Sequence, residues 1–143
     1  GCRTTGLDIS PRALEVLPWI WAGRVPDLPV PALVEGDVLT SSWLDALAPG
    51  VFDLVLSRWL LTHLPRTIKG TVLARLTRVG RVCVAIEGYD PKRSDFELAI
   101  PGEPGHWVSL EALDGYGFRH VPSITQNRHS RVYVSVQEAP WPR

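Results

Sequence analysis

The chain has 143 residues, a length suited to about one domain that buries roughly two thirds of its unfolded surface. Its 15 basic residues balance 15 acidic ones, so no net charge attracts a nucleic acid or an anionic membrane, and neither is expected as a partner. The longest apolar stretches are interrupted well before the ~18 residues that a membrane-spanning helix needs, which also argues against a membrane.

The two cysteines, Cys2 and Cys83, lie far apart, and Cys83 stands inside the apolar run VCVAI. This placement predicts a reduced thiol in the core rather than a disulfide scaffold, and therefore a cytoplasmic protein. The 4 histidines and 2 cysteines show no metal-ligand spacing, so no metal site is expected.

The first strand is expected over Thr4–Ile9. Ser10 is a natural helix N-cap and Pro11 suits the first helical position, so a short amphipathic helix follows. Pro18 is expected to interrupt this helix. The next stretch, Trp19–Pro31, is rich in tryptophan and proline and predicts an irregular connection or a broken helix.

A second strand is expected over Pro31–Val38, followed by a short helix that Ser41 or Ser42 caps and that runs to Ala48. The third strand is expected over Val51–Ser57 (VFDLVLS), which is nearly all apolar. Such a run is typical of a strand that is buried on both faces, as in a parallel sheet.

A longer helix is predicted over Pro65–Val79, where apolar residues recur at helical spacing. The residues expected on its buried face are Ile68, Val72, Leu73 and Leu76. The charged residues expected to point away from that face are Arg66, Lys69 and Arg75. A fourth buried strand is expected over Arg81–Glu87.

The C-terminal part is predicted to contain a long loop over residues 88–107 and a short helix over Ser109–Tyr116. Two antiparallel strands, Phe118–Val121 and Arg131–Gln137, are expected to close the chain. Strands that alternate with helices indicate an α/β fold with an antiparallel addition at one edge. The whole of residues 1–143 is therefore expected to form a single domain.

Polar side chains stand at the end of each of the four predicted parallel strands. They are Asp8, Asp37, the pair Ser57 and Arg58, and Glu87. Ligands of open parallel sheets bind beyond the carboxyl ends of the strands, so these groups are expected along one rim. An ionised Asp8 suits a pair of ribose hydroxyls, and Asp37 can accept a hydrogen bond from an exocyclic amine. A ligand that contains adenosine would use both carboxylates.

Five segments resemble those of a known family and follow one another in the same order and at similar spacing. They are GLDISPRALE, VEGDVL, FDLVLSRWLLTHL, LARLTRVGRVCVAIE and SLEALDGYGF. Together with the final hairpin, they resemble the class I S-adenosylmethionine-dependent methyltransferases over roughly residues 4–138. The resemblance implies a Rossmann-like, three-layer αβα fold with a mostly parallel sheet and a C-terminal antiparallel hairpin. It also implies that S-adenosylmethionine is the cofactor.

The resemblance assigns roles to the rim residues. Asp8 would hold the ribose and Asp37 would approach the adenine amine, with Val38 packed on the ring. The residues after the third strand would line the methionine end of the cofactor and the substrate side. The complete predicted cofactor-binding set is Asp8, Ile9, Gly36, Asp37, Val38, Ser57 and Arg58. The residues leave one alternative open, in which Asp8 and Asp37 only stabilise turns and bind no ligand.

The implied activity is methyl transfer from S-adenosylmethionine to a small-molecule acceptor. His63 is the candidate catalytic base, since it follows the third strand on the rim side. The alternative is that His63 only packs at a helix start between Leu61 and Leu64. A dinucleotide-binding oxidoreductase fits the motifs less well, because VEGDVL followed by FDLVLS is not its pattern.

The family's first strand and glycine-rich loop would precede GLDIS, where only a few residues stand. In the family that strand lies between the strands matched here by Thr4–Ile9 and Val51–Ser57, so both are expected to present an open edge. Three explanations stay open: an incomplete sequence, a partner chain or homo-oligomer that completes the sheet, or a degenerate domain without cofactor. A truncated or degenerate domain would have a non-catalytic role in binding or dimerisation, which is the alternative to an enzyme.

Overall fold

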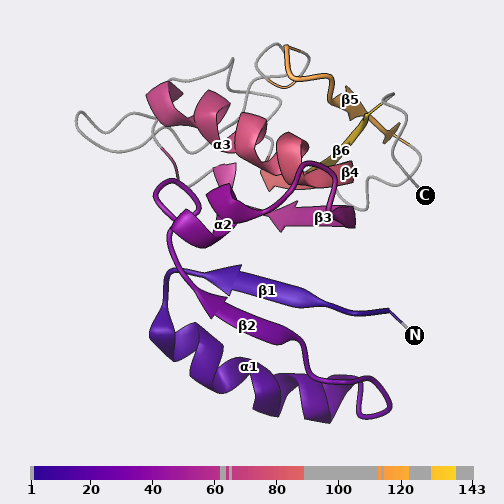
Figure 1. Ribbon diagram of the computed structural model, residues 1–143. Coiled ribbons are helices and arrows are strands. Elements are labelled where there is room, and N and C mark those ends of the chain that lie inside the picture. The colour runs from indigo at the N-terminus through magenta and orange to yellow at the C-terminus, as the bar shows by residue number, and fades with distance from the viewer. Residues whose placement is uncertain are drawn as a thin grey trace, which may run out of the picture. The chain divides into compact units, whose positions relative to one another are not determined.

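The computed structural model describes residues 2–61, 64, 66–88, 113, 115–122 and 130–137 (Figure 1). The chain forms two compact units, Gly1–Ala46 and Leu47–Arg143. Within the described residues no helix combines the length and the apolar character that crossing a membrane requires. A single domain over the whole chain stays a prediction.

The first unit contains β1 (Thr5–Asp8), α1 (Pro11–Arg24), β2 (Ala32–Glu35) and α2 (Ser42–Ala46). The strands β1 and β2 pair in parallel along their whole length. The helix α1 connects them and packs against both, as Figure 1 shows. This is the βαβ connection that parallel strands require.

The helix α1 begins as the sequence predicts and ends later. The side chain of Ser10 accepts a hydrogen bond from the Ala13 amide (3.2 Å), and Pro11 occupies the first helical position. The expected interruption at Pro18 is wrong, because the helix continues for 6 residues to Arg24. A proline removes one backbone hydrogen bond but does not prevent the next turn from forming. The irregular connection is accordingly confined to residues 25–31.

The second unit contains β3 (Phe52–Arg58), α3 (Arg66–Val79), β4 (Gly80–Gly88), β5 (Arg119–His120) and β6 (Ser130–Val136). The sheet order is β3-β4-β6-β5, with β3 parallel to β4 and the other two pairs antiparallel. The predicted α/β class with a C-terminal antiparallel hairpin is therefore confirmed.

The core of the second unit lies between α3 and one face of its sheet, which α3 covers in Figure 1. Its fully or almost fully buried residues include Val72, Leu73, Val79, Cys83, Ala85 and Phe118. Gly80 joins α3 directly to β4, and a Cβ atom there would approach Val55 Cγ2 to 2.7 Å and Cys83 Sγ to 2.8 Å. The glycine therefore permits the close packing of helix and strand at this junction.

The predicted burial of the third strand on both faces is wrong. Leu54 is 57% exposed and Leu56 is 61% exposed. Side chains alternate along a strand, and α3 packs on the opposite face, which carries Val55 and Ser57. In the described part of this unit, β3 is an outer strand of the sheet. The resemblance predicted this open edge, because the family's first strand would pair with β3.

The charged face of α3 also differs from the prediction. Lys69 is only 3% exposed, although the sequence placed it away from the buried face. Its spacing of three, four and seven residues from Val72, Leu73 and Leu76 puts it on the same side of the helix. The prediction that Lys69 points away from the core followed from its charge, although its spacing already indicated the buried face.

Several predicted features lie outside the described residues or only partly within them. The helix expected over Ser109–Tyr116 is described at Leu113, which is helical, and at residues 115–116, which form a turn. The expected loop is described only at residue 88, which belongs to β4, and His63 lies wholly outside the described residues. The two C-terminal strands are confirmed, with β5 shorter than expected.

Candidate cofactor-binding site

The carboxyl ends of β1 and β2 meet at one edge of the first unit, because the two strands are parallel. Asp8 is the last residue of β1, and Asp37 follows two residues after β2 ends. The Gly36 amide donates a hydrogen bond to the Asp8 carbonyl oxygen (2.9 Å). This contact continues the pairing of the strands and brings Asp8, Gly36 and Asp37 together, as the rim prediction requires.

Asp8 is exposed, and one of its carboxylate oxygens is already engaged. Its Oδ1 accepts a hydrogen bond from the Ser10 amide (2.8 Å), which shapes the turn between β1 and α1. Asp8 therefore has the turn role that the sequence left as an alternative. An ionised carboxylate accepts up to about four hydrogen bonds, so this role leaves acceptor capacity for a ligand.

Asp37 is half-buried and also shapes a turn. Its Oδ1 accepts a hydrogen bond from the Leu39 amide (2.8 Å), and its carbonyl oxygen accepts one from the Ser41 amide (2.8 Å). Val38 lies within this turn and is half-buried, whereas Ile9, beyond Asp8, is 67% exposed. The turn fixes where the Asp37 carboxylate stands relative to the end of β2.

Gly36 is closely packed at the end of β2. A Cβ atom at this position would lie 3.1 Å from Ser41 Oγ and 3.3 Å from Leu7 Cδ1. These distances are tight, so the glycine lets the end of β2 approach the residues below it. The chain is thus closely packed where β2 leads into the turn that carries Asp37.

The second unit presents a similar edge, where the parallel strands β3 and β4 end together. Ser57 pairs with Ala85, and Arg58 pairs with Ile86. Ser57 is 8% exposed, on the face covered by α3, whereas Arg58 is exposed. Of these two predicted residues, Arg58 is therefore the more accessible to a ligand at this edge.

Trp59, directly after β3, has a left-handed backbone with φ of 56°. Its amide donates a hydrogen bond to the Ile86 carbonyl oxygen (2.8 Å). This conformation is uncommon for a bulky side chain and often marks a functional position. The indole is 44% exposed at the edge where the resemblance places the methionine end of the cofactor.

The predicted site residues fall into two groups, one in each compact unit. The first unit holds Asp8, Ile9, Gly36, Asp37 and Val38, and the second holds Ser57 and Arg58. Within each unit, the structure brings its members to the carboxyl edge of a parallel strand pair. Among the residues described, no group of three histidine, cysteine or acidic side chains is arranged to hold a metal ion.

Glu87 is the clearest functional candidate that the sequence placed wrongly. It was expected at the exposed rim, but its exposed fraction is 0%. Its Oε1 accepts a hydrogen bond from the Leu61 amide (3.2 Å). Burial lowers the pKa of Lys69, and the Glu87 charge partly opposes that effect. The signal that sequence reasoning missed was the position of Lys69 on the apolar face of α3.

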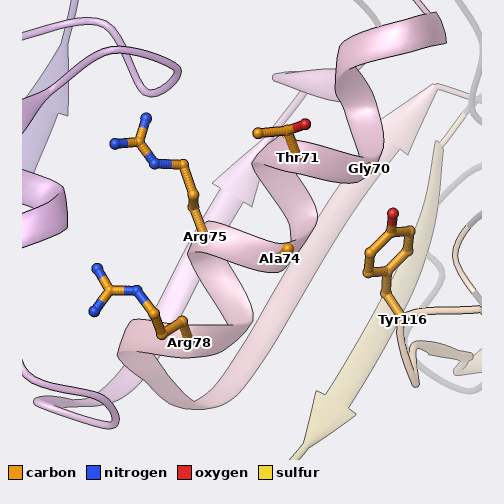
Figure 2. Close-up of a pocket in the computed structure, with 6 residues that line it drawn as sticks. All are labelled: Gly70, Thr71, Ala74, Arg75, Arg78 and Tyr116. Carbon is orange, nitrogen blue, oxygen red and sulfur yellow. The ribbon is translucent and has the colours of Figure 1, made fainter.

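A surface depression of about 430 Å³ lies over the outer side of α3. Its lining residues are Gly70, Thr71, Ala74, Arg75, Arg78 and Tyr116, none of which belongs to the predicted site. Figure 2 shows Arg75 and Arg78 projecting to one side of α3 and Tyr116 on the other. The Arg78 end of the helix leads into the start of β4, and thus lies toward the edge opposite the strands' carboxyl ends.

No protein-family model and no curated protein sequence matches the chain. Solved structures do match it. Magnesium protoporphyrin IX methyltransferase from Synechocystis, with bound SAM, is 17% identical, with a TM-score of 0.61 over 94% of this chain and 59% of its own. The N-terminal domain of EvdMO1, with SAH bound, is 17% identical, with a TM-score of 0.64 over 95% of this chain and 65% of its own.

A SAM-dependent methyltransferase from Methanosarcina mazei is 13% identical, with a TM-score of 0.61 over 94% of this chain and 82% of its own. The chain has the class I S-adenosylmethionine-dependent methyltransferase fold. It spans 59% and 65% of the length of the first two of these methyltransferase structures. The fold predicted from the order of the sequence motifs is thereby confirmed.

Proposed function

We propose that this chain is the cofactor-binding part of an S-adenosylmethionine-dependent methyltransferase that acts on a small molecule. The observation that carries the proposal is the position of Asp8 at the carboxyl end of β1, joined through Gly36 to the turn that holds Asp37. The fold supports it, and two of the structures that share this fold were solved with SAM or SAH bound.

The polar groups at the edge of the first unit fit an adenosine. The Asp8 carboxylate is exposed and retains acceptor capacity for the two adjacent ribose hydroxyls. The Asp37 carboxylate stands nearby on a fixed turn, where it can accept a hydrogen bond from the adenine amine. We assign Ile9, Gly36 and Val38 to the same site as residues that surround the adenosine.

S-adenosylmethionine supplies, when bound, a methyl group activated by its positively charged sulfur. Because the methyl is already activated, the chain mainly has to orient the reactants and exclude water. We assign this positioning at the methionine end to Ser57 and Arg58. We also propose that His63 accepts a proton from acceptors that must lose one during transfer.

Calorimetric titration with S-adenosylhomocysteine tests the proposal. The unmodified chain should bind it saturably. Asp8→Asn should weaken binding by roughly 10-fold or more, because a hydrogen bond to a charged acceptor contributes about 1.5–3 kcal/mol to the binding free energy. Asparagine retains an oxygen that can accept the hydrogen bond from the Ser10 amide, so the turn between β1 and α1 is preserved. The loss of affinity would then report the ligand contact itself.

Asp27→Asn is the matched control, because Asp27 is an exposed acid of the same unit outside the predicted site. Its affinity for S-adenosylhomocysteine should equal that of the unmodified chain. Equal affinity of Asp8→Asn and Asp27→Asn would remove Asp8 from the site. The absence of any saturable heat with a folded, monodisperse sample would contradict the proposal as a whole.

A non-catalytic binding or dimerising role is the second candidate. The exposed apolar face of β3, with Leu54 and Leu56, favours it because such faces often contact another chain. A homo-oligomer or a second chain that completes the sheet would then be the partner. Transfer of a labelled methyl group to a panel of small molecules would distinguish an enzyme from this role.

We also propose a cytoplasmic location. Both cysteines are free, one exposed and the other buried, which fits a reducing compartment.

A further inference from the structure

Two opposite charges are buried together in the second unit. Glu87, near the end of β4, is 0% exposed, and Lys69, on the face of α3 that packs against the sheet, is 3% exposed. The Glu87 carboxylate interacts electrostatically with the Lys69 ammonium. Two buried opposite charges are rarely the most stabilising choice, because apolar residues of the same size often stabilise the fold as well or better. The pair therefore calls for a specific structural role.

That role is indicated by what Glu87 contacts. Its Oε1 accepts a hydrogen bond from the Leu61 amide (3.2 Å), 26 residues earlier in the chain. Just before Leu61, the Trp59 amide donates to the Ile86 carbonyl oxygen (2.8 Å). The segment after β3 is thus tied to the end of β4 at two points, one through the backbone and one through a carboxylate.

The segment between these two ties holds an unfavourable conformation. Trp59 has a φ of 56°, a left-handed value that a bulky residue adopts only when its surroundings enforce it. The flanking hydrogen bonds to Ile86 and Glu87 supply that constraint. Trp59 nevertheless keeps 44% of its side chain exposed, so the constrained backbone presents an indole at the edge of the sheet.

We propose that Glu87 and Lys69 form a buried clamp that fixes the backbone of Trp59–Leu61 and so positions the methyl-donor side of the site. Glu87 supplies the acceptor that holds Leu61, and Lys69 compensates the carboxylate charge inside the core. Both are positioning residues that act through Trp59 and its neighbour Arg58. The clamp itself exists in the chain without a ligand, whereas its effect on cofactor binding rests on the proposed function.

Two double variants isolate the hydrogen bond to Leu61. K69M/E87Q and K69M/E87M both remove the buried charges and keep side chains of similar length. Only glutamine retains an oxygen that can accept the hydrogen bond from the Leu61 amide. A difference between the two variants therefore reports the acceptor, while burial and charge stay matched.

The readout is the ¹⁹F spectrum of the chain labelled with 5-fluorotryptophan, in which Trp59→Phe assigns one of the 6 tryptophan signals. K69M/E87Q should keep the Trp59 signal of the unmodified chain, and K69M/E87M should shift or broaden it. An unchanged Trp59 signal in K69M/E87M would overturn the clamp. So would an equal displacement of that signal in both double variants.

Leu73→Ala serves as the control for general loss of stability, since Leu73 is a buried residue of α3 outside the clamp. It should lower the stability of the unit without moving the Trp59 signal. If K69M/E87M does not fold, the single variant Glu87→Gln is compared with the unmodified chain by the amide shift of Leu61. A neutral acceptor gives a weaker hydrogen bond, so that amide signal should move upfield, and an unchanged signal would contradict the contact.

The effect on binding is measured separately. Relative to K69M/E87Q, K69M/E87M should bind S-adenosylhomocysteine about tenfold more weakly, a change equivalent to about 1.4 kcal/mol. A shifted Trp59 signal with equal affinities would confirm the clamp but remove its role in positioning the site. A shifted Trp59 signal in a chain that never binds the ligand would instead contradict the proposed function while the clamp stands.

Discussion

The two thiols occupy opposite environments. Burial raises the pKa of the Cys83 thiol from 9.0 to about 11, and its Sγ donates a hydrogen bond to the Leu76 carbonyl oxygen (3.3 Å). Cys2 is exposed. Since the thiolate is the reactive form, Cys83 is protected both by its neutral state and by the packing around it.

We therefore expect one reactive thiol in the folded chain and two in denaturant, as measured by titration with a disulfide reagent at pH 8. As the pH rises from 9 to about 11, the unfolded chain loses the Cys83 proton while the folded chain retains it. Stability should consequently fall across that window, and less so in Cys83→Ala. Fast modification of both thiols in the folded chain would contradict the buried position of Cys83.

Residue-level prediction succeeded where a side chain acts locally and failed where its partner is distant in sequence. Ser10 was identified as a cap because its role depends on Ala13, three residues away. The roles of Lys69 and Glu87 depend on a contact between α3 and β4 that the sequence does not display. Their charges therefore suggested solvent, although helical spacing already placed Lys69 beside Val72.

At the scale of elements, two glycines give opposite predictions for the same substitution. Gly80→Ala should destabilise the chain by about 1–3 kcal/mol, because the new Cβ would press on Val55 and Cys83 in the core. Gly23→Ala should stabilise it by about 0.4–1 kcal/mol, because Gly23 lies in α1 with nothing within 4 Å of an added Cβ. Urea unfolding measures both changes.

The two substitutions test the observed boundaries of the elements. If Gly23→Ala were neutral or destabilising, the helical continuation of α1 beyond Pro18 would be in doubt. A neutral Gly80→Ala would contradict the close contact between the end of α3 and the sheet.

The strands and helices were predictable because each carries a strong local pattern. The apolar runs predicted both ends of β3 and β4 to within one residue, and the spacing of Val72, Leu73 and Leu76 predicted α3. The extent of α1 was not predictable in this way. A proline inside a helical pattern either ends or kinks a helix, and the outcome at Pro18 depends on packing rather than on sequence.

At the scale of the whole molecule, the exposed apolar face of β3 predicts self-association. Leu54→Lys should lower the apparent mass of the chain at high concentration, as measured by light scattering during gel filtration, because a charge on this strand discourages contact between copies. The substitution is exposed, so stability should change by less than about 0.5 kcal/mol.

Leu28→Lys is its control, since Leu28 is 55% exposed and Leu54 is 57% exposed. Leu28 belongs to the first unit and is not part of β3, so its substitution should leave the apparent mass unchanged. An equal response of the two variants would mean that β3 has no special role in association. A monomer at all concentrations in the unmodified chain would contradict the prediction.

The candidate site could be predicted as a set of strand ends but not as a complete geometry. Parallel pairing places Asp8 beside the turn of Asp37, and it places Arg58 at the end of β3, as the order of strands implied. The turn contacts of Asp8 and Asp37, and the left-handed Trp59, depend on tertiary constraints that no short motif encodes.

The central proposal is that the carboxyl ends of these strands bind S-adenosylmethionine. The most direct test is a titration of the ¹⁵N-labelled chain with S-adenosylhomocysteine, followed by amide chemical shifts. The account predicts saturable shifts concentrated at Asp8, Gly36, Asp37, Arg58 and Trp59. The absence of saturable shifts, or shifts concentrated instead at Gly70, Arg75 and Tyr116 around the depression on α3, would contradict it.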